Sequence, residues 1–247
     1  MTDSEKRHPI AVRRMFDRIA RRYDLLNHLL SANFDRGWRR AAATEVPSDP
    51  GVSILDLCGG TGDMSVVLAR AGRARTVVCC DFSHAMLAVA GAKFKRERIE
   101  ATCLLLEADG LRLPFAEASF DAVTVAFGLR NFADLGAGLR EIHRVLSCGG
   151  RLIVLEFSTP SVPLLGGCYR FYLNRILPRL GDGISGASGS YHYLARTISG
   201  FPEPAILAGR IREAGFAACG WSTRTGGVVA IHTALKGECG RPGCVSE

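Results

Sequence analysis

The stretch Ile54-Leu55-Asp56-Leu57-Cys58-Gly59-Gly60-Thr61-Gly62-Asp63 contains the features that decide the fold. The apolar run Val52–Cys58 predicts a buried strand, and a helical pattern over Met64–Arg70 follows it almost at once. A glycine-rich turn between a strand and a helix lets the backbone approach a ligand that a Cβ atom would repel. The stretch therefore predicts a strand–turn–helix unit with a ligand-binding turn.

Strands and helices continue to alternate after this turn. Further strand-like runs are Thr76–Asp81, Ala101–Glu107, Phe120–Phe127 and Arg151–Phe157, with helical patterns over Ala85–Arg98 and Leu135–Leu146. Such alternation of near-continuous apolar strands with helices predicts an α/β fold with a parallel sheet covered on both faces. Glycines are expected to end two of the helices, at Gly72 and at Gly149-Gly150.

The chain changes character after Phe157. A Gly/Ser-rich loop over Gly181–Ser190 is followed by a predicted helix, Pro204–Gly215, and by a predicted terminal pair of strands, Phe216–Thr225 and Val228–Lys236. Residues 237–247 show no periodicity and are expected to form a disordered tail.

Acidic residues end the second and third predicted strands. Asp81 lies about 20 residues after the turn, where an acid can accept hydrogen bonds from a ribose, and Asp109 is placed to meet an adenine amine. A dinucleotide fingerprint needs a third glycine, which is missing after Gly62. Acid-x-x-x-Gly-x-Gly, here Asp56 to Gly62, is instead the pattern of class I S-adenosylmethionine methyltransferases, in which Asp56 and the turn would hold the amino-acid end of the cofactor. The alternative interpretation is that these acids cap turns and helices.

Composition and charge narrow the function classes. The 247 residues carry a net charge of +7, and residues 1–40 alone hold ten basic and five acidic residues. Because the positive charge is local, nucleic-acid binding is not expected. No run has the length of a membrane span, the N-terminus lacks the apolar core of a secretory signal, and nine cysteines form no Cys-x-x-Cys pair. We therefore expect a reduced cytoplasmic protein without a metal site.

Residues 10–30 predict an amphipathic helix. Its apolar stripe runs from Val12 to Leu30, with arginines 13, 14, 18, 21 and 22 opposite, and Phe34 and Trp38 follow. Three roles fit this pattern: a lid over the cofactor, contact with an anionic membrane surface, or simple packing on the domain.

Seven motifs together resemble one family, the ubiquinone/menaquinone-biosynthesis C-methyltransferases. In chain order they are Tyr23–Ser31 followed by Trp38, Leu55–Asp63, Phe127–Asn131, Arg144–Pro160, Ile176–Gly181, Tyr191–Ala195 and Thr225–His232. The resemblance covers residues 12–236. Departures from the family pattern are Leu26, Asp35, Ala126 and Ser147-Cys148.

The resemblance implies a class I methyltransferase fold, Rossmann-like, whose mostly parallel seven-stranded sheet carries an antiparallel C-terminal strand and helices on both faces. It implies S-adenosylmethionine as cofactor, bound by Thr61, Asp81, Asp109 and Gly110, with Asp56, Gly60 and Gly62 as further candidates. One domain is expected over residues 1–236, made of a lid region (1–45), a cofactor core (52–157) and a substrate side (158–236).

The implied reaction is methylation of a ring carbon in a prenylated quinol, from demethylmenaquinol to menaquinol, with the benzoquinol of the ubiquinone pathway left open. Candidates to position the quinol oxygens are Arg130, Asn131, Tyr191 and His192. Arg130 could instead pair with Asp134. A methyltransferase for another lipid or small molecule is the alternative; a nicotinamide-dependent oxidoreductase and a nucleic-acid-binding module are less consistent with the residues. The oligomeric state is open, and a prenylated substrate would bring a cytoplasmic enzyme to the inner face of the membrane.

Overall fold

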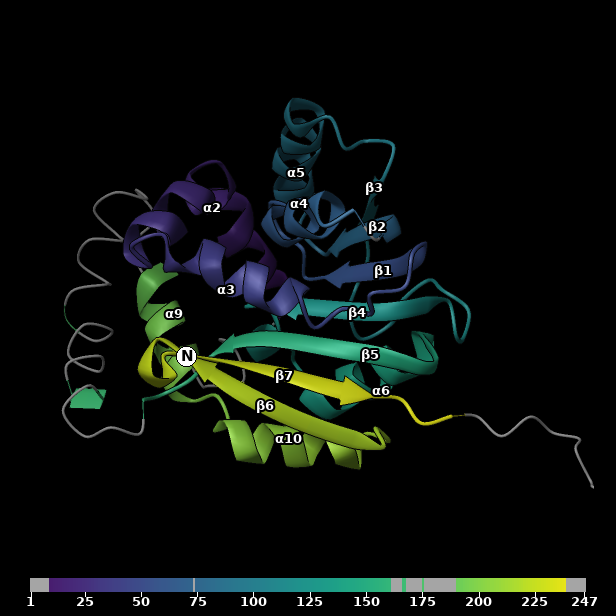
Figure 1. Ribbon diagram of the computed structural model, residues 1–247. Helices are drawn as coiled ribbons and strands as arrows, with labels where there is room; N and C mark the ends of the chain where they lie inside the picture. The colour runs from purple at the N-terminus through teal and green to yellow at the C-terminus, as the bar shows by residue number, and fades with distance from the viewer. Residues whose placement is uncertain (1–8, 73, 161–165, 168–174, 176–189, 239–247) are drawn as a thin grey trace, which may run out of the picture.

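The structure is a computed structural model that describes residues 9–72, 74–160, 166–167, 175 and 190–238, and a seven-stranded sheet forms its centre (Figure 1). The strand order is β3-β2-β1-β4-β5-β7-β6. The strands are β1 (Val52–Leu57), β2 (Ala74–Asp81), β3 (Cys103–Glu107), β4 (Phe120–Ala126), β5 (Leu146–Phe157), β6 (Ala218–Arg224) and β7 (Val229–Leu235). Neighbours among β1–β5 pair in parallel, whereas β7 runs antiparallel to both β5 and β6. The expected mostly parallel sheet with an antiparallel C-terminal strand is confirmed.

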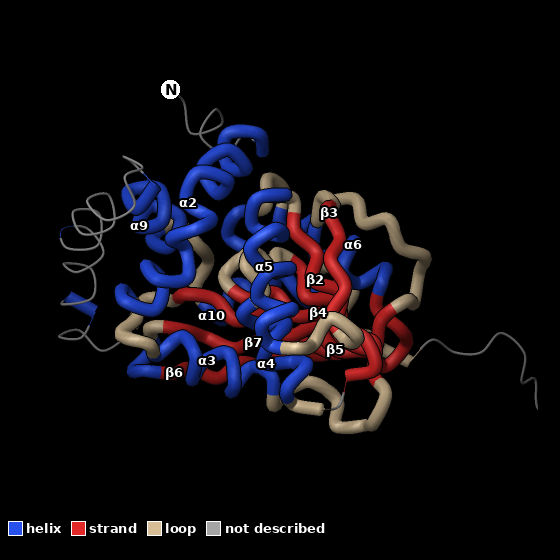
Figure 2. Tube along the Cα trace, turned by 90° about the horizontal axis from the view of Figure 1, so that it is seen from above, coloured by secondary structure: helices blue, strands red, loops and turns tan. Residues whose placement is uncertain are grey.

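Helices cover both faces of the sheet (Figures 1 and 2). The helices are α2 (Pro9–Leu30), α3 (Phe34–Ala43), α4 (Asp63–Arg70), α5 (His84–Glu97), α6 (Leu135–Val145), α9 (Ser190–Ser199) and α10 (Pro204–Glu213), with short 3-10 turns η1 (Leu129–Asn131) and η3 (Thr225–Gly227). Alternate side chains of β1 serve the two faces: Ile54 packs with α3, α4 and α5, and Leu55 packs with α6 and α10. α2 and α9 lie beyond the carboxyl ends of the parallel strands.

The apolar stripe of the N-terminal helix packs on the domain. Val12, Ile19 and Leu26 of α2 are buried. Ile19 and Met86 of α5 belong to one hydrophobic cluster. Leu25 and Leu29, on the other side of α2, are exposed. Within the described part of the chain, no helix combines the length and apolar character needed to cross a bilayer.

One predicted helix end was wrong. Gly149 and Gly150 lie inside β5, because α6 ends at Val145 and the chain enters the strand directly through Leu146 in an extended conformation. Gly149 has φ 73°, and its N–H donates to the Lys236 carbonyl, so the glycine accommodates an irregularity in the sheet rather than a helix cap. Gly72, with φ 72°, does follow the end of α4.

The cysteines among the described residues divide into two groups. Cys58, Cys79, Cys80, Cys103 and Cys219 are free thiols. Cys148 takes part in a disulfide, so the expectation of a fully reduced protein does not hold at that position.

The glycine-rich turn provides a test of the fold. Gly62 has φ 81°, and a Cβ atom there would lie 2.6 Å from the Phe94 ring; Gly60 has φ 56° and open space around it. We expect Gly62→Ala to lower the free energy of unfolding by about 3 kcal/mol, from left-handed strain plus overpacking. The matched variant Gly60→Ala has only the strain, about 1 kcal/mol. Urea titration measures both, and equal losses would contradict the role of Phe94.

Candidate functional site

The turn after β1 lies at the carboxyl edge of the sheet, where several residues adopt left-handed angles. Cys58 has φ 57°, and Phe127, just after β4, has φ 61°. The two turns touch, because a Cβ atom on Gly128 would lie 2.3 Å from the Cβ atom of Cys58. Positive φ is uncommon outside glycine and tends to gather at functional sites. The backbone therefore favours a ligand site between the ends of β1 and β4.

Asp81, at the end of β2, holds the turn from the side. Its Oδ2 accepts the Gly60 N–H at 2.9 Å, and its Oδ1 accepts the Ser83 N–H at 2.9 Å. Only 6% of the residue is exposed, and burial raises the pKa of its carboxyl group to about 6. α5 is capped by the Ser83 hydroxyl rather than by Asp81. The carboxylate thus links the turn to β2 and still has lone pairs available.

Asp56 occupies a different environment from the one the sequence suggested. It is fully buried, its Oδ2 accepts the Ser65 hydroxyl at 2.6 Å, and its Oδ1 accepts the Thr124 hydroxyl at 3.0 Å. Burial raises its pKa to about 6. These contacts favour a role beneath the turn, joining β1 to α4 and β4.

A cavity of about 60 Å³ brings several of the predicted cofactor residues together. Asp81, Asp109, Gly110 and Asn131 line it with Cys58 and with apolar side chains of Val12, Leu57, Phe82, Leu111 and Phe132. Asp109 is exposed, and its Oδ1 accepts the Leu111 N–H at 2.9 Å. Apolar walls suit the face of a purine ring, and a carboxylate can accept hydrogen bonds from ribose hydroxyls. The lining of the cavity therefore fits a nucleoside. Pockets for such ligands are at least about 300 Å³, so the walls must move outward on binding.

Cys58 is a further wall of this cavity. Burial raises the pKa of its thiol well above the usual value, and the nearby negative charge of Asp81 raises it further. The thiol is therefore protonated at neutral pH.

α2 closes over the turn through polar contacts as well as packing. Thr61 donates its hydroxyl to Asp24 at 2.5 Å, and Ser83 donates its hydroxyl to Asp17 at 2.5 Å. The other oxygen of Asp24 pairs with Lys93 of α5 at 2.7 Å. Thr61, predicted to bind cofactor, thus bonds to α2 in this conformation.

On the acceptor side, Arg130 forms a buried ion pair. Its guanidinium lies 2.7 Å from Glu156, and its backbone N–H also donates to that carboxylate at 3.3 Å. The alternative partner, Asp134, instead caps α6 by accepting the Ala137 N–H. The Nε atom of Arg130 is buried without a hydrogen-bond partner among the described residues.

Asn131 connects the cavity to α9. Its Oδ1 accepts the Tyr193 hydroxyl at 3.2 Å. Tyr191 and His192, the other two candidates, belong to α9, but their side chains lie outside the described residues.

Ligand atoms of His28, Asp35 and Asp63 lie within 4.8 Å of one another. Cations already accompany the acids: Lys93 hydrogen-bonds to Asp63, and Arg39 Nε lies 3.8 Å from Asp35. Like charge opposes a further cation at this position, so the group is best described as a network of ion pairs.

Sequence reasoning missed Glu156, Asp24, Lys93 and Tyr193. Glu156 had a visible signal, because a single acid interrupts the apolar run of β5 and a buried charge needs a partner. Asp24 and Lys93 form an ion pair although they lie 69 positions apart in the chain, and no local sequence pattern predicts such a pair.

Solved structures of low sequence identity share the fold. A methyltransferase from Aquifex aeolicus superposes with a TM-score of 0.59 at 14% identity, covering 80% of this chain and 89% of that one. The [4+2]-cyclase SpnF superposes with a TM-score of 0.62 at 18% identity, covering 93% and 96%. Because a cyclase shares this architecture, the fold alone does not specify the reaction.

Relatives of higher sequence identity are more informative about the reaction than the shared fold is. A demethylmenaquinone methyltransferase from Corynebacterium kroppenstedtii is 44% identical over 94% of this chain and 96% of its own length. One from Deinococcus radiodurans is 48% identical over 83% of this chain and 85% of its own length. The ubiE/COQ5 methyltransferase family model matches residues 1–236. The chain therefore belongs to the ubiE/COQ5 methyltransferase family and is an S-adenosylmethionine-dependent methyltransferase.

Proposed function

We propose that this protein methylates a ring carbon of a prenylated quinol, converting demethylmenaquinol to menaquinol. The observation that carries the proposal is its 44–48% identity, over most of the chain, to relatives named demethylmenaquinone methyltransferases. The alternative acceptors, a benzoquinol or another lipid or small molecule, have no separate observation in their favour.

The cofactor supplies an electrophilic methyl group on a sulfonium. In this proposal Asp81 accepts hydrogen bonds from the ribose, and Asp109 and Gly110 lie beside the adenine in the cavity that they share. Gly60, Thr61 and Gly62 face the amino-acid end. Asp56 supports the turn from below rather than touching the cofactor, since it is fully buried and does not line the cavity.

The acceptor carbon becomes nucleophilic when a neighbouring quinol hydroxyl loses its proton, so donors and acceptors must position that oxygen. Arg130, Asn131, Tyr191 and His192 are the proposed positioning groups. Glu156 fixes the Arg130 guanidinium at one end and leaves Nε without a partner.

Aromatic packing beside Arg130 supports a dry reaction site. Phe127 and Phe157 have ring centroids 4.6 Å apart, and Trp38 packs edge-on against both. An environment without water favours dispersal of the sulfonium charge in the transition state.

Of the three roles for the N-terminal helix, the contacts favour a lid. Val12 of α2 lines the cofactor cavity, and Asp24 bonds to Thr61 in the turn. We infer that α2 moves outward to admit the cofactor and closes to exclude water. We also propose that residues 1–236 form one domain with lid, core and substrate-side regions. In this proposal the enzyme is cytoplasmic and makes peripheral contact with the membrane.

The proposal is tested with methyl-labelled S-adenosylmethionine and reduced demethylmenaquinone. The expected result is one labelled methyl group on the quinone ring, identified by mass spectrometry. Cofactor binding without methylation of any prenylated quinol would overturn the acceptor assignment.

Asp81→Asn is expected to weaken cofactor binding about tenfold or more, because charge-assisted hydrogen bonds to the ribose contribute about 1.5–3 kcal/mol. The Asp81 carboxylate, with a pKa of about 6, is protonated at lower pH. The affinity of the wild-type protein should therefore fall as pH drops below 6, and that of the variant should not. Calorimetry measures both. The control is Asp121→Asn, which alters an acid that accepts the Ser53 N–H away from the cavity; a similar loss there would reject the ribose assignment.

Asp24→Ala is expected to speed cofactor dissociation about fivefold or more, because α2 loses its bonds to Thr61 and Lys93. Stopped-flow fluorescence, with buried Trp38 beside the site as reporter, measures the rate. The exposed acid Asp49 supplies the control, Asp49→Ala. An unchanged dissociation rate in Asp24→Ala would contradict the lid.

A further inference from the structure

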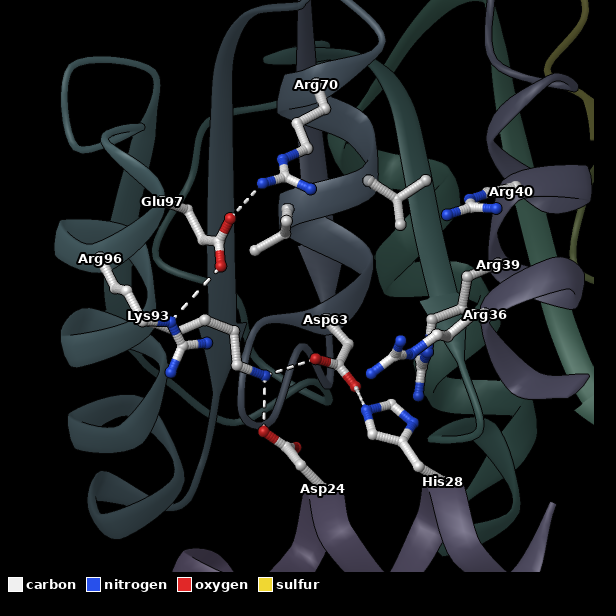
Figure 3. Close-up of a pocket in the computed structure, with 12 residues that line it drawn as sticks. Asp24, His28, Arg36, Arg39, Arg40, Asp63, Arg70, Lys93, Arg96 and Glu97 are labelled. Atoms are coloured by element: carbon white, nitrogen blue, oxygen red, sulfur yellow. Dashed lines mark hydrogen bonds and ion pairs between the residues drawn. The ribbon is translucent and has the colours of Figure 1, made fainter. Parts of the chain in front are cut away.

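A second, larger concavity lies on the face of the sheet covered by α3, α4 and α5 (Figure 3). This basic groove has a volume of about 500 Å³, and its apolar lining residues are Val66 and Val67 of α4. Six cationic side chains line it: Arg36, Arg39, Arg40, Arg70, Lys93 and Arg96. It is distinct from the cofactor cavity, which shares none of its lining residues.

The groove carries more positive charge than its acids balance. Its three acidic lining residues, Asp24, Asp63 and Glu97, leave a surplus of three positive charges. The acids are already paired: Glu97 with Arg70 and Arg96, and both aspartates with Lys93. Among the described residues, no acid lies within ion-pair distance of Arg36 or Arg40. Arginines that neighbours do not neutralise are free to bind an anion.

Arg39 adds an unsatisfied donor at the inner end of the groove. The residue is only 7% exposed, and its guanidinium lies over the Phe127 ring at 5.2 Å. Its Nε atom is buried without a hydrogen-bond partner in the described structure, since the nearest acid oxygen, on Asp35, is 3.8 Å away. A buried donor without a partner is costly and is usually satisfied in the functional state of a protein.

Four of the arginines come from two helices that border the groove. Arg36, Arg39 and Arg40 are three and four positions apart on α3, so they project from one side of that helix. Arg70 faces them from the end of α4, across the groove. Guanidinium groups bind phosphate oxygens with paired N–H donors, and a phosphate can accept from several of them at once.

We propose that the basic groove binds a phosphate group. The phosphate can belong to a soluble ion or to a phospholipid headgroup. A lipid source is consistent with three exposed apolar side chains on the two helices next to the groove: Leu25, Leu29 and Phe34. The site is independent of the methyl acceptor and adds a third ligand to the cofactor and the acceptor.

The test uses Arg36→Gln/Arg40→Gln, which removes two exposed charges without touching the buried network. The matched control is Arg140→Gln/Arg210→Gln, the same charge change on α6 and α10 at the opposite face. Calorimetry with pyrophosphate at constant ionic strength measures the soluble source. Sedimentation with phosphatidylglycerol-containing vesicles, compared with pure phosphatidylcholine vesicles, measures the lipid source. Calorimetry with S-adenosylmethionine checks that the cofactor site is intact in each variant.

The expected result is binding of at least one probe, weakened about tenfold or more in Arg36→Gln/Arg40→Gln and unchanged in the control, with cofactor affinity preserved. Loss of pyrophosphate binding identifies a soluble phosphate ligand, and loss of vesicle binding alone identifies a lipid headgroup. The proposal is overturned if the wild-type protein binds neither probe, or if both double variants lose binding equally. A failure of quinol methylation would leave these measurements unaffected.

Discussion

One carboxylate, that of Asp81, joins the backbone of the turn after β1 to the backbone at the start of α5. Asp56 does the corresponding work beneath the turn, where it collects hydroxyl groups from α4 and β4. Burying two acids near each other is unfavourable unless each is well supplied with hydrogen bonds. Here four donors meet that need, and the glycine-rich turn is held in a fixed conformation by the same bonds. The conformation of the glycine-rich turn at this edge of the sheet depends on that arrangement.

The fold could be predicted from the sequence because its signals are local. Apolar runs of β1 and β4 and the helical pattern of α5 each identify their own element, and the glycine turn identifies the ligand edge. Gly149-Gly150 misled the prediction because a glycine with positive φ ends a helix and bends a strand equally well. Only the partner, the carbonyl of Lys236 more than 80 residues away, distinguishes the two cases.

The candidate site was predicted in part for the same reason. Asp81, Asp109 and Gly110 follow strand ends, so parallel topology alone brings them to one cavity. Asp56 also lies near a strand end but is buried in the core, and the sequence carries no sign of the Ser65 and Thr124 hydroxyls that donate hydrogen bonds to it. The contacts of α2 depend on long-range packing, and their existence could not be read from the helix itself.

Cys58 has a consequence for the chemistry of the enzyme. A sulfonium methyl donor alkylates sulfur nucleophiles readily, and the thiolate is the reactive form of cysteine. In the cavity wall the thiol stays protonated, because burial and the charge of Asp81 both raise its pKa. A small, polarisable side chain thus lines this cavity without being a nucleophile at neutral pH. The negative charges of Asp81 and Asp56, the two acids that organise the turn, add to the effect of burial in keeping this thiol protonated.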